Sequence, residues 1–170
     1  LDLNDTHKKF YENVENGIKD DVDKVALNTS NIRAMIVRLR QAVSCPSVLT
    51  TQDIPNTKII RTCELVEEIV QNNNKVVIMS TFKEPLYQLN ELLSEYKPLI
   101  GTGDMKEEEF SKAIDTFQQD DEHKVLLCTI SKAGTGLTLN RARYMILIDS
   151  PWTDGLFKQV CDRIHRINNK

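Results

Sequence analysis

The chain has 170 residues, which suits a single domain with an attached arm. Its formal net charge of −3 provides no overall attraction for nucleic acid, so any such site must be a local patch. No apolar run approaches the roughly 20 residues of a membrane-spanning helix, and the four widely spaced cysteines match no zinc-binding spacing. We therefore expect an intracellular protein with reduced thiols and no membrane partner, cytoplasmic or nucleoid-associated if its source is prokaryotic or viral.

The first 50 residues contain few glycines and prolines and predict a helical arm. Asp5 or Thr6 is placed to cap a first helix that runs to about Ile18. A second helix is predicted over residues 31–43, and Pro46 ends it because proline supplies no backbone donor. The apolar stripe of this second helix consists of Ile32, Met35, Ile36, Leu39 and Val43.

A polar linker at residues 50–56 is the predicted boundary between this arm, residues 1–50, and a second domain, residues 57–170. After the linker, short apolar runs alternate with single helical patterns. Continuous apolar runs of this kind predict an α/β domain with a parallel sheet covered by helices on both faces. Strands are predicted at 75–79, 98–100, 125–129 and 144–148, and helices at 58–70, from 81 onwards, at 106–119 and from 154 onwards. The stripe of the helix that begins near residue 81 is predicted to be Leu86, Leu89, Leu92 and Leu93.

The predicted strands are each followed by a polar or small-residue segment. Ligands of parallel sheets bind outside the carboxyl ends of the strands, so these segments form the candidate site. They are Ser80-Thr81, Gly101–Gly103, Thr129–Gly136, with a small-residue loop from Ser131, and Asp149–Trp152.

The glycine loop and the last helix carry phosphate-binding features that do not decide the function by themselves. Gly134-Thr135-Gly136 fits either a tight turn or a ligand loop, and the chain contains no G-x-x-x-x-G-K-[ST] phosphate cradle. In the last helix, Gln159, Arg163 and Arg166 fall on one face. Its arginines fit either surface ion pairs or the stabilisation of charge on a transferring phosphoryl group.

Three blocks of sequence together resemble a known family. They are Lys132-Ala133-Gly134-Thr135-Gly136-Leu137-Thr138-Leu139, Ile148-Asp149-Ser150-Pro151-Trp152-Thr153 and Gln159-x-x-Asp162-Arg163-x-His165-Arg166-Ile167. Their order and spacing resemble motifs V and VI in the second RecA-like lobe of Swi/Snf-like ATPases of helicase superfamily two. Residues 75–82 resemble motif IV, and the Leu39-Arg40-Gln41 segment resembles the stretch just ahead of that lobe. The resemblance implies a RecA-like fold for residues 57–170, with motifs IV to VI.

The resemblance also implies roles for individual residues in a DNA-dependent ATPase. Arg163 and Arg166 match the motif VI arginines that reach ATP phosphates across the cleft between two lobes. Gln159 and Gly136 match nucleotide-side positions. The remaining matches lie along the path of the DNA backbone and comprise Thr81, Phe82, Thr129, Ser131, Lys132 and Trp152. Contacts of this kind carry no base information, which suits a motor that moves along any sequence.

The implied partners are the first RecA-like lobe of the same parent chain and the backbone of double-stranded DNA. The implied cofactors are ATP and Mg²⁺, with Mg²⁺ held by the first lobe, so we expect this chain to be half of an enzyme and inactive alone. Three departures concern fine geometry. Asn168-Asn169 replace the usual Gly-Gln, the loop Ala133-Gly134-Thr135-Gly136 lacks an extra glycine that is common in the family, and Leu137-Thr138-Leu139 replaces L-N-L. The alternatives are a stand-alone α/β binding module for an anionic ligand or protein partner, and a scaffold with vestigial motor residues.

Overall fold

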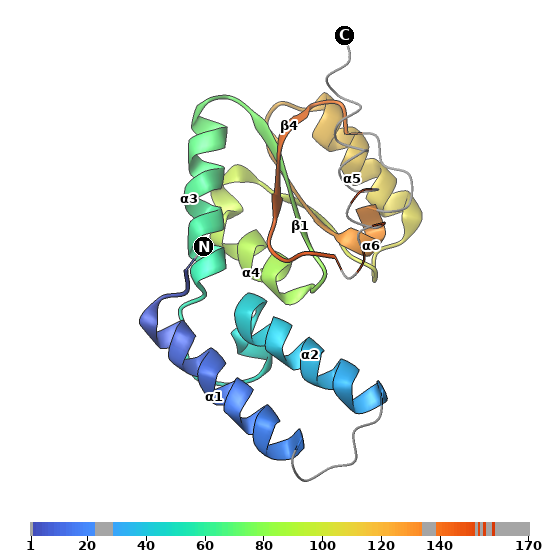
Figure 1. The fold of residues 1–170 in the computed structure, drawn as a ribbon. Coiled ribbons are helices and arrows are strands. Elements are labelled where there is room, and N and C mark those ends of the chain that lie inside the picture. The colour runs from blue at the N-terminus through green and yellow to red at the C-terminus, as the bar shows by residue number, and fades with distance from the viewer. Residues whose placement is uncertain are drawn as a thin grey trace. The chain divides into compact units, whose positions relative to one another are not determined.

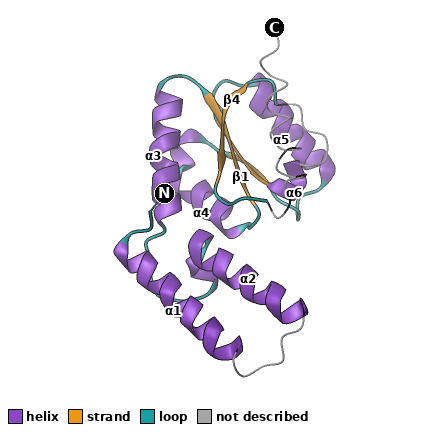
Figure 2. Ribbon diagram, in the orientation of Figure 1, coloured by secondary structure: helices purple, strands orange, loops and turns teal. Residues whose placement is uncertain are grey.

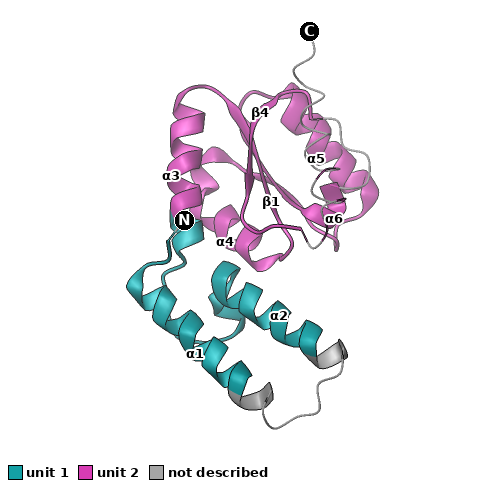
Figure 3. Cartoon of the chain, in the orientation of Figure 1, with its two compact units in different colours: residues 1–60 teal, residues 61–170 magenta. Residues whose placement is uncertain are grey.

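The structure, a computed structural model, describes residues 2–22, 29–133 and 139–151, together with 153, 155 and 158. The chain divides into two compact units, residues 1–60 and residues 61–170 (Figure 3). The described part of the first unit is helical, whereas the second alternates strands and helices (Figure 2). None of the helices in the described ranges is long and apolar enough to cross a membrane.

The described residues between 2 and 56 of the first unit form two α-helices and a short 3₁₀ helix. Helix α1 (Asp5–Val22) packs on α2 (Thr29–Ser44), and η1 (Pro46–Val48) follows directly. The predicted end of α2 at Pro46 is confirmed, because this proline begins the next turn. The predicted cap of α1 is wrong: the side-chain oxygen of Asn4 accepts the His7 N–H at 2.9 Å. An asparagine one residue ahead of the helix satisfies one of its unpaired donors.

Buried polar contacts hold these helices to the segment that follows η1. The His7 side chain is wholly buried, and its Nε2 lies 2.8 Å from the carbonyl oxygen of Ala42. The backbone N–H and side-chain amide of Asn4 both donate to Thr57 Oγ1, at 3.0 and 2.9 Å. Asn56 donates to the carbonyl oxygen of Ser44 at 2.9 Å. The residues around Thr57 therefore belong structurally with the helical arm.

The apolar stripe predicted for α2 is only partly buried. Ile32 and Ile36 are 43% and 41% exposed, whereas Ala42, which the stripe did not include, is fully buried. A single neighbouring helix covers only a narrow face of α2, so some residues of an apolar stripe that spans positions 32 to 43 stay exposed.

The second unit is a four-stranded sheet with helices on both sides. Its strands are parallel in the order β2-β3-β1-β4, which confirms the predicted parallel α/β architecture. Figure 1 shows α3 and α4 on one side of the sheet and α5 on the other. The elements are α3 (Thr57–Gln71), β1 (Lys75–Ser80), α4 (Glu84–Leu92), η2 (Ser94–Tyr96), β2 (Leu99–Gly101), α5 (Glu107–Gln119), β3 (Val125–Thr129), α6 (Ile130–Ala133) and β4 (Ala142–Leu147).

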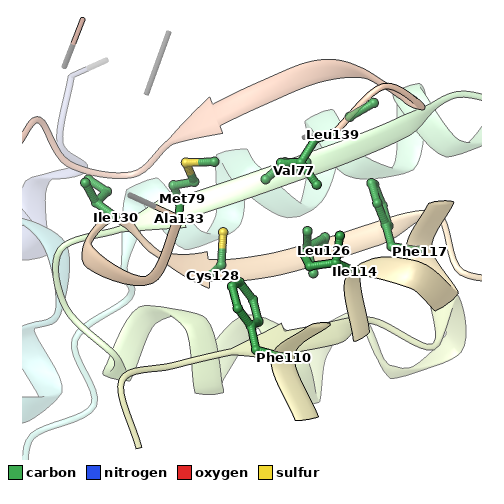
Figure 4. Close-up of a cluster of buried hydrophobic side chains, with 11 residues drawn as sticks. Val77, Met79, Phe110, Ile114, Phe117, Leu126, Cys128, Ile130, Ala133 and Leu139 are labelled. Carbon is green, nitrogen blue, oxygen red and sulfur yellow. The ribbon is translucent and has the colours of Figure 1, made fainter. Parts of the chain in front are cut away.

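The core beneath α5 is built by alternate residues of the central strands. Val77 and Met79 of β1 and Leu126 and Cys128 of β3 join one buried cluster (Figure 4). Their neighbours Val76, Ile78, Val125 and Leu127 are also fully buried and point to the opposite face, as successive strand residues must. Helix α5 and the region beyond it supply the rest of the cluster through Phe110, Ile114, Phe117, Ile130, Ala133, Leu139 and Ala142.

Three local predictions in this unit are wrong. Leu92 is 57% exposed, because the buried positions Leu86, Leu89 and Leu93 follow i, i+3, i+7 spacing and Leu92 falls off that face. The loop predicted from Ser131 begins instead with helix α6. Strand β4 is not buried along its length, since it lies at the edge of the sheet and Tyr144 is 45% exposed.

Candidate functional site

The carboxyl ends of the strands meet at one edge of the sheet, as their parallel direction requires. Ser80 at the end of β1 pairs in register with Thr129 at the end of β3, and Gly101 at the end of β2 pairs with Cys128. The backbone N–H of Ile148, just after β4, donates to the carbonyl oxygen of Met79 at 3.0 Å. The described parts of the segments that follow the strands therefore lie at the same edge, as the sequence predicted.

A buried carboxylate joins the segment after β4 to the segment after β1. Asp149 is 6% exposed, and its Oδ2 accepts the Ser80 hydroxyl proton at 2.5 Å. Both Asp149 oxygens lie 3.1 Å from the backbone nitrogen of Thr81, which donates to them. Ser80 Oγ in turn accepts the Phe82 N–H at 3.1 Å. Asp149 therefore holds Ser80 and Thr81 directly, and Phe82 through Ser80, at the point where the chain leaves the sheet for α4.

A second set of polar contacts joins the start of α4 to the loop after β2. Lys83 forms an ion pair with Asp104, and the hydroxyl oxygens of Tyr87 and Thr102 lie 3.4 Å apart. Thr102 is buried, whereas Asp104 is largely exposed. These contacts place the loops after β1 and β2 beside one another at the same edge of the sheet.

Lys132 in α6 is buried, which the sequence did not predict. Its Nζ donates to the carbonyl oxygen of Met105 at 3.0 Å and to Glu107 Oε1 at 2.7 Å. The same ammonium lies 5.4 Å from the centroid of the Phe110 ring. Its side chain is 8% exposed, whereas that of Glu107 is 70% exposed. Lys132 therefore attaches α6 to the beginning of α5.

The structure describes five of the ten residues that the sequence assigned to the site. Thr81 and Phe82 are half-buried and adjacent in the Asp149 network, whereas Ser131 is exposed. Thr129 is buried, and its Oγ1 lies 3.4 Å from the Ser131 hydroxyl. These residues come together at the ends of β1 and β3. The other five, Gly136, Trp152, Gln159, Arg163 and Arg166, lie outside the described residues.

The sequence placed Asp149 and Ser80 at strand ends without assigning either a role in the site. The available signal was that Asp149 directly follows the apolar run at residues 144–148, while Ser80 directly follows the run at residues 75–79. Their contact joins residues 69 positions apart, so the order of the strands was needed to find it. Within the described ranges, no three His, Cys, Asp or Glu side chains gather to hold a metal ion.

Comparison with known proteins places this geometry in a family. Residues 57–168 match the model of the helicase conserved C-terminal domain family, which covers the whole sheet and its helices. The chain belongs to this helicase C-terminal domain family. The match begins at the first residue of α3 and ends at residue 168.

One curated relative and two solved structures illustrate the similarity of this helicase C-terminal domain to known proteins. An uncharacterized ATP-dependent helicase of Mycoplasma pneumoniae is 25% identical over 175 residues, which cover 100% of this chain and 17% of that protein. The SWI2/SNF2 ATPase C-terminal domain of Sulfolobus solfataricus has a TM-score of 0.73 at 22% identity, covering 88% of this chain and 71% of that one. The SWI2/SNF2 ATPase core of the same organism, in complex with double-stranded DNA, has a TM-score of 0.77 at 24% identity, covering 99% and 36%.

These similarities confirm the RecA-like fold and the resemblance to the second lobe of Swi/Snf-like ATPases. The chain spans about a sixth of the length of the curated relative from Mycoplasma pneumoniae.

Proposed function

We propose that this chain is the second motor lobe of an intracellular, ATP-dependent DNA translocase. In this proposal the lobe works with a first RecA-like lobe of the same polypeptide, binds the backbone of double-stranded DNA, and contributes arginines to an ATP site between the lobes. The observation that carries the proposal is the family match over residues 57–168, which includes both motif VI arginines.

The described geometry supports a DNA-facing role for the edge where β1 and β3 end. Thr81 and Ser131 offer hydroxyls there, and Phe82 offers an aromatic ring, all on segments fixed at their bases by the sheet. Hydroxyl and backbone contacts to phosphate position a protein on nucleic acid without reading its sequence. We assign direct contact with the DNA backbone to Thr81, Phe82, Ser131 and Trp152, whereas Thr129 and Lys132 support this surface from below.

The nucleotide side of the proposal rests on the sequence of motifs V and VI. Arg163 and Arg166 would bind the phosphates of ATP, because a guanidinium is always charged and offers several donors in a rigid fork. Gln159 and Gly136 would contact the nucleotide from the same side. Mg²⁺ would be held by the first lobe and would neutralise phosphate charge there. Because the chain contains no Walker A segment, we propose that it does not hydrolyse ATP alone at a useful rate.

The test is ATP hydrolysis by the longer polypeptide that carries this lobe, with and without duplex DNA, for wild type and Arg166→Ala. We expect DNA to stimulate hydrolysis in the wild type and the stimulated rate to fall about a thousandfold in the variant, with ATP binding largely retained. Arg38→Ala, which changes an exposed arginine of α2, is the matched control for loss of a surface charge. Unchanged hydrolysis in Arg166→Ala, or an absence of DNA stimulation in the wild type, would overturn the proposal.

A further inference from the structure

We propose that Asp149 is a positioning residue that sets the geometry of the DNA-contacting segment after β1. This inference rests on the proposed function, because it concerns how the same surface is held. It assigns a role to a carboxylate that touches neither DNA nor ATP in the proposal.

The first step of the argument is the place of Asp149 in the chain. It comes just after Ile148, whose backbone N–H donates to the carbonyl oxygen of Met79 at 3.0 Å. The Asp149 carboxylate accepts hydrogen bonds from the Ser80 hydroxyl at 2.5 Å and from the Thr81 N–H at 3.1 Å, at the base of the proposed DNA-contacting segment after β1. A single buried side chain therefore links the end of β4 to the end of β1, although α4, β2, α5, β3 and α6 lie between these two strands in the chain.

The second step is which backbone donors the network engages. The Thr81 N–H is engaged by Asp149, and the Phe82 N–H is engaged by Ser80 Oγ at 3.1 Å. Both backbone donors therefore point into the protein, and the backbone that carries the Thr81 and Phe82 side chains is held in one conformation. Asp149 therefore orients these side chains rather than contributing a contact of its own.

The third step is the strength of the arrangement. Two donors, the Ser80 hydroxyl and the Thr81 N–H, bond to one carboxylate that is 6% exposed, and hydrogen bonds to a charged acceptor are stronger than neutral ones. Replacing the carboxylate by an amide removes the charge and, in either orientation, puts an NH₂ donor at the place of an oxygen that lies 3.1 Å from the Thr81 nitrogen, so one donor faces another. The end of β1 would then loosen while the hydrophobic sheet beneath it, which includes Val77 and Met79, stays packed.

The experiment compares Asp149→Asn, Ser80→Ala and their double variant in the full polypeptide that carries this lobe. The readouts are the DNA concentration that gives half-maximal stimulation of ATP hydrolysis and the maximal rate at saturating DNA. We expect the half-maximal DNA concentration to rise about tenfold in Asp149→Asn, the effect of losing one charge-assisted hydrogen bond, with a much smaller change in the maximal rate. The double variant should resemble the Asp149 variant, because both changes remove the same link.

Lys75→Met is the matched control, since it removes a buried polar side chain from the opposite end of the same strand. It should lower the melting temperature without moving the half-maximal DNA concentration. If Asp149→Asn and Ser80→Ala leave that concentration at the wild-type value, or if Lys75→Met raises it equally, the positioning role is overturned while the motor function stands. If the wild type shows no DNA stimulation, the proposed function fails first and the positioning role fails with it.

Discussion

Gly101 lies directly beneath the ring of Phe110. A Cβ at position 101 would stand 2.0 Å from Cε2 and 2.4 Å from Cδ2 of that ring, far inside van der Waals contact. The absence of a side chain at the end of β2 is therefore what lets the first turn of α5 rest on the sheet. Phe110 is 2% exposed and belongs to the core cluster. The Lys132 ammonium lies 5.4 Å from the centroid of its ring.

This contact predicts that Gly101→Ala destabilises the domain. The added methyl group forces Phe110 out of its position, and overpacking of this kind costs about 1–3 kcal/mol. The free energy of unfolding, measured by chemical denaturation, should fall by that amount. Gly103→Ala is the control, because nothing lies within 4 Å of a Cβ placed at that position. Equal stability of the two variants would contradict the close packing at Gly101.

Because the Lys132 ammonium is bonded to Met105 and Glu107, we expect its substitution to change the stability of the protein rather than the salt dependence of DNA binding. Lys132→Gln removes the ion pair with Glu107 and weakens the bond to the Met105 carbonyl, so we expect a loss of about 1–3 kcal/mol in the free energy of unfolding. A lysine that neutralises a DNA phosphate would instead lower the slope of log affinity against log salt by about 1.

The measurement for Lys132 is DNA affinity of the full polypeptide as a function of salt, beside denaturation of the same variants. Glu107→Gln is the control: its carboxylate is 70% exposed, so removing its charge should cost little stability. A slope that falls in Lys132→Gln would show that the side chain leaves Glu107 to bind phosphate.

Lys75 predicts a pH dependence of stability on the alkaline side. Its Nζ donates to the carbonyl oxygens of Phe117 and Asp120, both at 2.6 Å, and burial lowers the pKa of this lysine below its ordinary value of 10.5, against the opposing effect of Asp121. The unfolded chain therefore binds the proton more tightly than the folded one between the lowered pKa and 10.5. Across that window the stability of the wild type should rise with pH relative to Lys75→Met.

The measurement is denaturation of wild type and Lys75→Met at a series of pH values from neutral to about 10.5, the ordinary pKa of lysine. Below the window the variant should still be less stable by about 1–3 kcal/mol, because the carbonyl groups at the end of α5 lose their donor. A difference between the two proteins that is constant, or that shrinks as the pH rises, would contradict a lowered pKa at Lys75.

Cys128 predicts a thiol that reacts only after unfolding. It is fully buried in β3, and burial raises its pKa to about 12. At pH 8 only about one molecule in ten thousand would carry the thiolate, which is the form that reacts. Alkylation of the native protein followed by peptide mass analysis should leave Cys128 unmodified and modify Cys63, which is partly exposed, slowly because burial also raises its pKa. Labelling of Cys128 at the rate of Cys63 would contradict the packing of this strand.

Much of the fold could be predicted from local pattern. The apolar run at residues 125–129 is strand β3, and the helix predicted over 106–119 is α5 to within one residue. Both signals are local. A strand that is buried on both faces needs a continuous run of apolar residues, and an amphipathic helix needs apolar residues that recur at helical spacing. Elements at the rim were predicted less well: Leu92, Ile32, Ile36 and Tyr144 are apolar yet more than two-fifths exposed. Periodicity shows which residues share a face but not whether another element covers it.

By itself the sequence determined the family, the parallel α/β class and the edge of the sheet at which the candidate site lies. Motifs can be recognised from the order of residues, and strands that alternate with single helices must run parallel. The tertiary structure decided what individual side chains do at that edge. Lys132, which the resemblance places along the DNA path, bonds to residues 25 and 27 positions away, and Asp149 reaches Ser80 across 69 positions. Such contacts depend on the strand order β2-β3-β1-β4 and on how closely α5 and α6 approach the sheet. An unpaired buried charge costs several kcal/mol, so each buried charged group pairs with a partner that the fold brings within reach.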